Sequence, residues 1–97
     1  MSALMIATIA VKDAAKFQEY LSETQKVAAP YGAELLCRGK ADRTLTGGEA
    51  GHALTVIVKF PDLQTIDDWY ASDAYQALIP LRDQGTDMTM VSYEALD

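Results

Sequence analysis

The sequence predicts one α+β domain, a four-stranded antiparallel sheet with two helices packed on one of its faces. Three observations support this prediction. Apolar runs and helical patterns follow one another in the order strand, helix, strand, strand, helix, strand. The chain has 97 residues, enough for a single core but too few for two. The strands carry apolar residues at both parities, which suits a sheet covered on both faces. Residues 1–97 are therefore treated as a single domain.

The first two elements are a strand and a helix. Residues 4–11 are rich in β-branched and apolar side chains, and they lack the basic start of a secretion signal, so we expect a strand there. Asp13 is expected to cap the helix. Apolar residues at spacings of three and four form one stripe along that helix: Phe17, Tyr20, Leu21, Thr24, Val27, Ala28 and Tyr31.

A β-hairpin is expected next. Pro30 and Gly32 end the helix, and a second strand follows over 33–39 and resumes over 43–46. The glycine-rich stretch 47–52 has the composition of a turn, which predicts a hairpin with the following strand.

The second half repeats the pattern. Residues 53–60 form the clearest strand of the chain, and Asp62 is expected to cap the helix after it. Ser72 interrupts that helix and is expected to cap a second helical piece, which Pro80 kinks or ends. A last strand follows Gly85.

This order is that of the ferredoxin-like βαββαβ fold, whose helices both lie on one face of the sheet. Along the first strand, Leu4 and Ile6 point to one face, and Met5 and Ile9 point to the other. Two helices cover only one of these apolar faces. We therefore expect a second copy of the chain to cover the open sheet face, giving a symmetric homodimer.

Six short stretches spread over nearly the whole chain support a family resemblance. They are Ala29-Pro30-Tyr31-Gly32, Leu36-Cys37-Arg38-Gly39-Lys40, Phe60-Pro61, Trp69-Tyr70-Ala71-Ser72, Tyr75-Gln76-Ala77-Leu78 and Leu81-Arg82-Asp83. In them the chain resembles the uncharacterised family called domain of unknown function 1330. The resemblance implies a dimeric α+β barrel, in which two ferredoxin-like protomers pack sheet on sheet. Relatives in that superfamily include cofactor-independent monooxygenases, haem proteins, isomerases and binding modules. The chain departs from the family at Ala33 and Lys40, where glycine is frequent, and at Pro80.

Charge and single residues exclude several classes of function. The 8 basic and 14 acidic residues give a net charge of −6, which repels nucleic acid and anionic membranes. Cys37 is the only cysteine, so we expect no internal disulfide, a cytoplasmic location and an inert buried thiol. His52 is the only histidine and has no neighbours at metal-ligand spacing, so neither a metal nor a cofactor is expected.

Arg38 is the first candidate for ligand binding. By strand parity it shares its side of the second strand with Leu36 and Lys40, where a charge needs a partner. It either forms a salt bridge to Glu34, Asp42 or Asp83, or anchors an acidic small molecule through its planar guanidinium.

An aromatic cluster supplies the other candidates. Its rings either pack in the core or line a cleft between helix and sheet, close to a helix that begins at Ser72. The expected ligand-binding residues are Tyr31, Arg38, Trp69, Tyr70, Ser72, Tyr75 and Arg82.

Three functions follow from these features. The first is a homodimer that binds a small, partly apolar organic molecule, with an acidic group as one option, in the cleft. The second is an enzyme like a cofactor-independent monooxygenase or an isomerase, in which His52 or a tyrosine moves protons. The third is a structural or regulatory dimer without a pocket.

Overall fold

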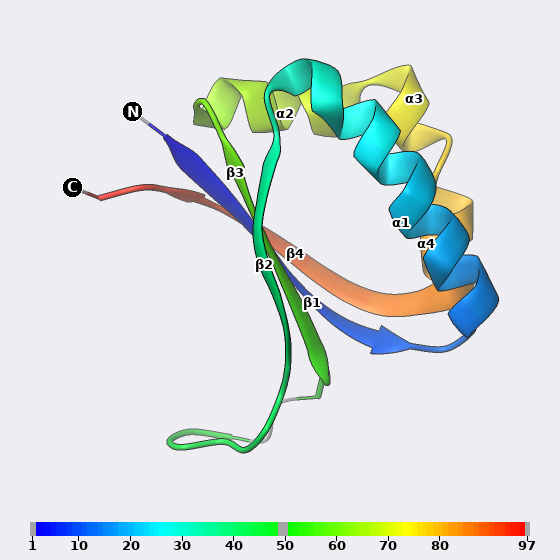
Figure 1. The fold of residues 1–97 in the computed structure, drawn as a ribbon, viewed down its shortest axis with the longest axis vertical. Helices are drawn as coiled ribbons and strands as arrows, with labels where there is room; N and C mark the ends of the chain where they lie inside the picture. Colours follow the sequence, from blue (N-terminus) through cyan, green and yellow to red (C-terminus); the bar gives the residue numbers. More distant parts are fainter. Residues whose placement is uncertain (1, 49–50, 97) are drawn as a thin grey trace.

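The computed structural model describes residues 2–48 and 51–96 and contains the expected sheet and helices (Figure 1). The elements are β1 (Ala3–Val11), α1 (Ala14–Ala28), the 3-10 helix η1 (Ala29–Tyr31), β2 (Glu34–Lys40), β3 (Leu54–Phe60), α2 (Leu63–Ala71), α3 (Asp73–Gln76), α4 (Ile79–Gly85) and β4 (Thr86–Glu94). The sheet has the order β2-β3-β1-β4, and neighbouring strands are antiparallel. The predicted ferredoxin-like fold is confirmed.

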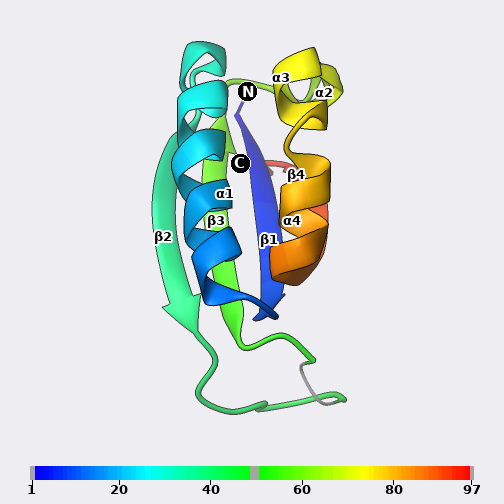
Figure 2. The same cartoon turned by 90° about the vertical axis from the view of Figure 1, so that its right-hand side faces the viewer.

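The helices cover one face of the sheet, and the core lies between the two layers (Figure 1). Figure 2 shows α1 in front of β2 and β3 and α4 on the β4 side, with β1 between them. Alternate residues of β1, namely Ala3, Met5, Ala7 and Ile9, face the helices and are each at most 8% exposed. The period of two in a strand explains why every second residue of β1 is buried.

Side-chain caps fix where the helices begin. The side chain of Asp13 accepts a hydrogen bond from the backbone N–H of Lys16 at 3.1 Å, and Asp62 accepts one from Thr65 at 2.7 Å. Each bond satisfies an N–H group that has no partner inside its helix. Both predicted caps are confirmed. At the end of η1, Gly32 has a φ of 75°, a conformation that glycine adopts without strain.

The second helical segment is divided into three pieces. Ser72 begins α3, because its hydroxyl accepts from the backbone N–H of Tyr75 at 3.2 Å. Pro80 lies in the first turn of α4, where its missing N–H costs no hydrogen bond. The chain therefore breaks its helix before the proline, as the sequence predicts.

The strand β2 differs from its prediction in two ways. A β-bulge shifts its register against β3 between Leu35 and Cys37. The predicted resumption over 43–46 is wrong, since residues 41–48 contain no strand. The last ladder contact joins the N–H of Ala41 to the carbonyl of Ala53 at 2.6 Å, and β3 extends no further back to pair with 43–46. In the turn expected over 47–52, residues 49 and 50 lie outside the described residues.

The other face of the sheet carries apolar side chains that no helix covers. Ile6 pairs with Ile57 on one side and with Val91 on the other, so three branched side chains form a row across the sheet. Val91 is 42% exposed and Tyr93 is 47% exposed. We call this surface the open face.

Candidate functional site

A largely apolar cavity of about 220 Å³ lies between α1 and the sheet, and we call it the α1 cavity. Small side chains leave this space unfilled, among them Ala7, Ala28, Ala29 and Ala33. Its larger lining residues include Leu21 and Thr24 of α1, Leu35 and Arg38 of β2, Val56 and Val58 of β3, Trp69 of α2, and Met88 and Met90 of β4.

Two of the residues that line the α1 cavity have a buried polar atom without a partner. They are Thr24, through its Oγ1, and Trp69, through its Nε1. Within residues 2–48 and 51–96 neither atom has a hydrogen-bond partner within 3.5 Å, although Thr24 lies near enough to the Tyr20 hydroxyl to oppose slightly the rise in the Tyr20 pKa. Leaving a polar group unpaired after burial costs about 1–3 kcal/mol, so proteins rarely tolerate it without a reason. The cavity therefore has apolar walls, and two of the residues that line it each carry a buried, unused hydrogen-bonding atom.

Arg38 lines the same cavity from β2, although its neighbours differ from those predicted. The bulge at Leu36 moves the following residues by one, so Arg38 pairs with Val56 and shares a face with Leu35. Its expected neighbour on that face, Leu36, is the residue that the bulge leaves unpaired. The side chain is exposed, and among the described residues it forms no ion pair with Glu34, Asp42 or Asp83.

The aromatic cluster of the second helical segment is closely packed. The ring centroids of Trp69 and Tyr75 are 4.5 Å apart, and those of Tyr70 and Tyr75 are 5.0 Å apart. Trp69 is 2% exposed, Tyr75 is 0% exposed and Tyr70 is 39% exposed. Of the three rings, Trp69 alone lines the α1 cavity.

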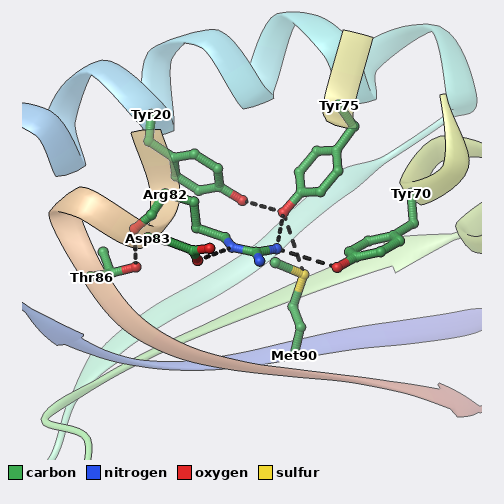
Figure 3. A network of polar contacts seen from close by, with 7 residues as sticks. All are labelled: Tyr20, Tyr70, Tyr75, Arg82, Asp83, Thr86 and Met90. Atoms are coloured by element: carbon green, nitrogen blue, oxygen red, sulfur yellow. Dashed lines mark hydrogen bonds and ion pairs between the residues drawn. The ribbon is translucent and has the colours of Figure 1, made fainter. Parts of the chain in front are cut away.

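A hydrogen-bonded network joins the predicted residues Tyr75, Tyr70 and Arg82 to Tyr20 of α1 (Figure 3). The hydroxyls of Tyr20 and Tyr75 are 2.8 Å apart, and Nη1 of Arg82 donates to Tyr75 at 3.1 Å and to Tyr70 at 3.4 Å. Burial, reinforced by the neighbouring Tyr75, raises the pKa of Tyr20 far above its usual range. Burial also raises the pKa of Tyr75, although its hydrogen bonds to Tyr20 and Arg82 oppose this. Both phenols therefore stay protonated at neutral pH.

Two predicted ligand-binding residues have structural contacts instead of cavity positions. The hydroxyl of Ser72 donates to the carbonyl of Trp69 at 2.7 Å while it caps α3, so both its donor and its acceptor are engaged. Tyr31 packs against the core at the end of η1 and does not line the α1 cavity.

His52 lies on the open face, away from the α1 cavity. Its Nδ1 is 2.9 Å from the hydroxyl of Thr8, and its Nε2 is 3.3 Å from the carboxylate of Asp87. With 17% of its side chain exposed, it is more enclosed than a solvated loop residue. Cys37 is exposed, so the expectation of a buried thiol is wrong for the protomer. Cys37 lies on β2, an edge strand with every residue exposed, and it pairs with Ile57 of β3.

Sequence reasoning missed the contribution of Thr24 and of the two β4 methionines to the cavity. The signal for Thr24 was present, since it is a polar residue within the apolar stripe of α1. Met88 and Met90 fall in the predicted last strand, but strand parity does not show which part of a sheet face the helices leave uncovered.

Neither a metal site nor a membrane span is found in the described part of the chain. No group of three or more His, Cys, Asp and Glu side chains there could hold a metal ion. No helix in the same ranges is long and apolar enough to cross a membrane.

Solved structures share this fold at low sequence identity. A protein of unknown function from Rhodopseudomonas palustris superposes with a TM-score of 0.83 at 13% identity, over 99% of this chain and 83% of that one. SnoaB, a cofactor-independent oxygenase from Streptomyces nogalater, gives 0.71 at 10% identity, over 99% and 94%. A dimeric ferredoxin-like protein of unknown function from Thermobifida fusca gives 0.60 at 16% identity, over 98% and 92%.

The family comparison agrees with the resemblance seen in the sequence. No curated protein matches the chain significantly. The family model described as domain of unknown function (DUF1330) matches residues 2–96, and the chain therefore belongs to this family.

Proposed function

We propose that the protein is a homodimer that binds a small, largely apolar organic molecule in the α1 cavity. The observation that carries this proposal is the unpaired state of two buried polar atoms, Thr24 Oγ1 and Trp69 Nε1, in residues that line one cavity. A ligand with an oxygen acceptor would supply the missing hydrogen bonds. A few polar groups among apolar walls are the usual composition of a small-molecule site.

The lining residues suggest the chemistry of the ligand. The indole N–H of Trp69 can only donate, whereas the hydroxyl of Thr24 can donate or accept. Arg38 adds a positive charge that no ion pair within the described residues neutralises. An apolar chain or ring with a carboxylate fits this set, with the carboxylate near Arg38. Tyr31, Tyr70, Ser72 and Tyr75 would then support the site from outside the cavity.

The enzyme alternative has less support. Its proton-transfer candidates are poorly placed, because His52 lies on the open face and the pKa values of Tyr20 and Tyr75 are raised by burial. A general base works best when its pKa lies near the working pH. The likeness to SnoaB is one of fold, which does not carry a reaction. The third function, a dimer without a pocket, leaves Thr24 and Trp69 unexplained.

Octanoate and octanol can test the ligand proposal, because they share an apolar chain and differ in charge. Trp69 is the only tryptophan, so its fluorescence reports on binding beside its ring, and methyl NMR signals locate the binding in the cavity. Arg38→Gln should weaken octanoate binding about 3–10-fold and leave octanol unchanged, as expected for one partly exposed charge contact.

Lys40→Gln provides the matched control, since it removes a nearby positive charge from a residue that does not line the cavity. It should leave both affinities unchanged. Methyl NMR signals of Leu21, Leu35 and Val56 should shift on binding. If neither octanoate nor octanol moves these signals, the cavity does not bind such ligands. An equal loss of octanoate affinity in Arg38→Gln and Lys40→Gln would show that Arg38 has no specific role.

The open face supports the dimer part of the proposal. Single exposed apolar residues are common on monomers, but Ile6, Ile57 and Val91 form a continuous apolar row, which is typical of an interaction surface. The protein from Thermobifida fusca with this fold is described as dimeric. In such a dimer the exposed Cys37 would lie close to the interface.

Sedimentation tests the dimer directly. The wild type should sediment at twice 10.6 kDa, and Ile6→Lys should convert it to a monomer, because the new charge would be buried in the interface. Leu63→Lys is the control, since Leu63 is 37% exposed on the helix side. A wild-type monomer at micromolar concentration would refute the proposed assembly.

A further inference from the structure

A second hollow lies on the helix side of the sheet, between α2, α4 and β4. It has a volume of about 380 Å³, and we call it the Arg82 groove. Ile66, Trp69 and Tyr70 line it from α2, Arg82 from α4, and Ser92 from β4. Trp69 also borders the α1 cavity, so its ring lies between the two hollows.

The guanidinium of Arg82 is held in place but not fully used. Its Nε donates to the carboxylate of Asp83 at 3.1 Å, and its Nη1 donates to Tyr75 and Tyr70. Within residues 2–48 and 51–96 the remaining nitrogen, Nη2, forms no hydrogen bond, and Figure 3 shows it without a contact. Only 16% of the side chain is exposed. The network thus fixes the orientation of a cation that still has two N–H donors to offer.

Two hydroxyls of the groove add donors. Tyr70 accepts a hydrogen bond from Arg82, which leaves its own O–H proton available. Ser92 lies on the helix-facing side of β4, opposite Met5, and forms no side-chain hydrogen bond within the described residues. The three residues that carry these unused donor groups, Arg82, Tyr70 and Ser92, line one space together with the apolar Ile66 and Trp69.

The charge of Arg82 remains available to a ligand. Burial alone would lower the pKa of Arg82, but its hydrogen bonds to Tyr70 and Tyr75 outweigh burial and raise it, so the group stays protonated. Asp83 is 63% exposed on its side chain, and solvent screens its pairing with Arg82. Asp67, which is exposed, is the one acidic residue among those that line the groove.

We propose that the Arg82 groove binds a small carboxylate with a flat apolar body, held by Arg82 Nη2 and the hydroxyls of Tyr70 and Ser92. Planar guanidinium groups pair well with carboxylates, and hydrogen bonds to an ionised acceptor are the stronger kind. This inference is independent of the α1 cavity, because its polar groups belong to other residues.

Benzoate tests the proposal, with benzamide as its neutral counterpart. Benzoate should shift the methyl NMR signals of Ile66, which lines the groove, and leave those of Leu21 and Val56 unmoved. Benzamide should bind at least about 10-fold more weakly, since it lacks the charge-assisted contact. Shifts confined to Leu21 and Val56 would overturn the groove while supporting the α1 cavity.

Single-residue variants test the donors. Tyr70→Phe keeps the ring and should weaken benzoate about 5–10-fold, and Ser92→Ala should weaken it less. Arg82→Lys keeps the charge but not the planar donor group, and it should lose most of the affinity. Lys40→Gln is the control for net charge and should have no effect. Because Arg82→Lys also disturbs the network, Tyr70→Phe and Ser92→Ala decide the matter: unchanged benzoate affinity in both would refute the proposal.

Discussion

Two regions on the helix side of the sheet differ in their buried hydroxyls: one hydroxyl beside the α1 cavity is unpaired, whereas those around α3 and α4 are bonded to protein groups. Thr24 has an unpaired hydroxyl beside the α1 cavity. Under α3 and α4, Tyr75 bonds to Tyr20 and Arg82, and the buried Thr86 donates to the carbonyl of Arg82 at 2.7 Å.

This difference separates stability from binding. A buried polar group with a protein partner contributes to the folded state, and one without a partner costs free energy unless a ligand pairs with it. The same chemical change, removal of one hydroxyl, should therefore have opposite effects in the two regions. Three predictions test that contrast.

Tyr75→Phe should have the largest effect. It leaves the ring in place but deprives Tyr20 of its partner and Arg82 of one acceptor, so we expect a loss of about 2–3 kcal/mol in the free energy of unfolding. Urea denaturation at fixed protein concentration measures it. Tyr31→Phe is the control, since the Tyr31 hydroxyl has no hydrogen bond within the described residues, and it should change stability by less than about 0.5 kcal/mol. Equal losses would contradict a special role for the network.

Alkaline pH should weaken the same region. The pKa values of Tyr20 and Tyr75 are raised in the folded state, so above pH 10 the unfolded chain releases these protons first. The contribution of these tyrosines to the free energy of unfolding is fully present below that pH. Above it, the free energy of unfolding falls by about 1.4 kcal/mol per pH unit for each tyrosine. Urea titrations between about pH 9 and 11 measure the slope. Tyr20→Phe should reduce it by half; a variant with the wild-type slope would exclude Tyr20 as its source.

The sequence predicted the layers because their signals are local. Asp13, Asp62 and Ser72 each precede a helical pattern and each accept a hydrogen bond from a residue three positions later. Strand parity on β1 needs only the neighbouring residues. Such signals do not depend on how the elements later pack.

The candidate site was predictable only in part, because it depends on packing between distant elements. The bulge at Leu36 changes which residues accompany Arg38, and nothing in the sequence of β2 marks it. Trp69 and Arg82 line hollows, while Tyr75 is fully buried between them. All three belong to the second helical segment of the sequence, so periodicity cannot separate their roles.

Thr24→Val and Thr86→Val make the smallest but most direct comparison. Thr86 is 3% exposed and its hydroxyl is paired, so its replacement should cost about 1 kcal/mol. Thr24 is unpaired, so its replacement should leave stability unchanged or raise it by up to about 1 kcal/mol, because an apolar methyl group replaces a buried hydroxyl. Thermal and urea unfolding of both variants, without ligand, measure the difference. Thr24→Val should also weaken octanoate binding, since it removes a hydrogen-bonding group from the cavity. A loss of stability in Thr24→Val as large as that in Thr86→Val would mean that the Thr24 hydroxyl serves the fold, and the α1 cavity would then lose one of the two groups on which its proposed ligand depends.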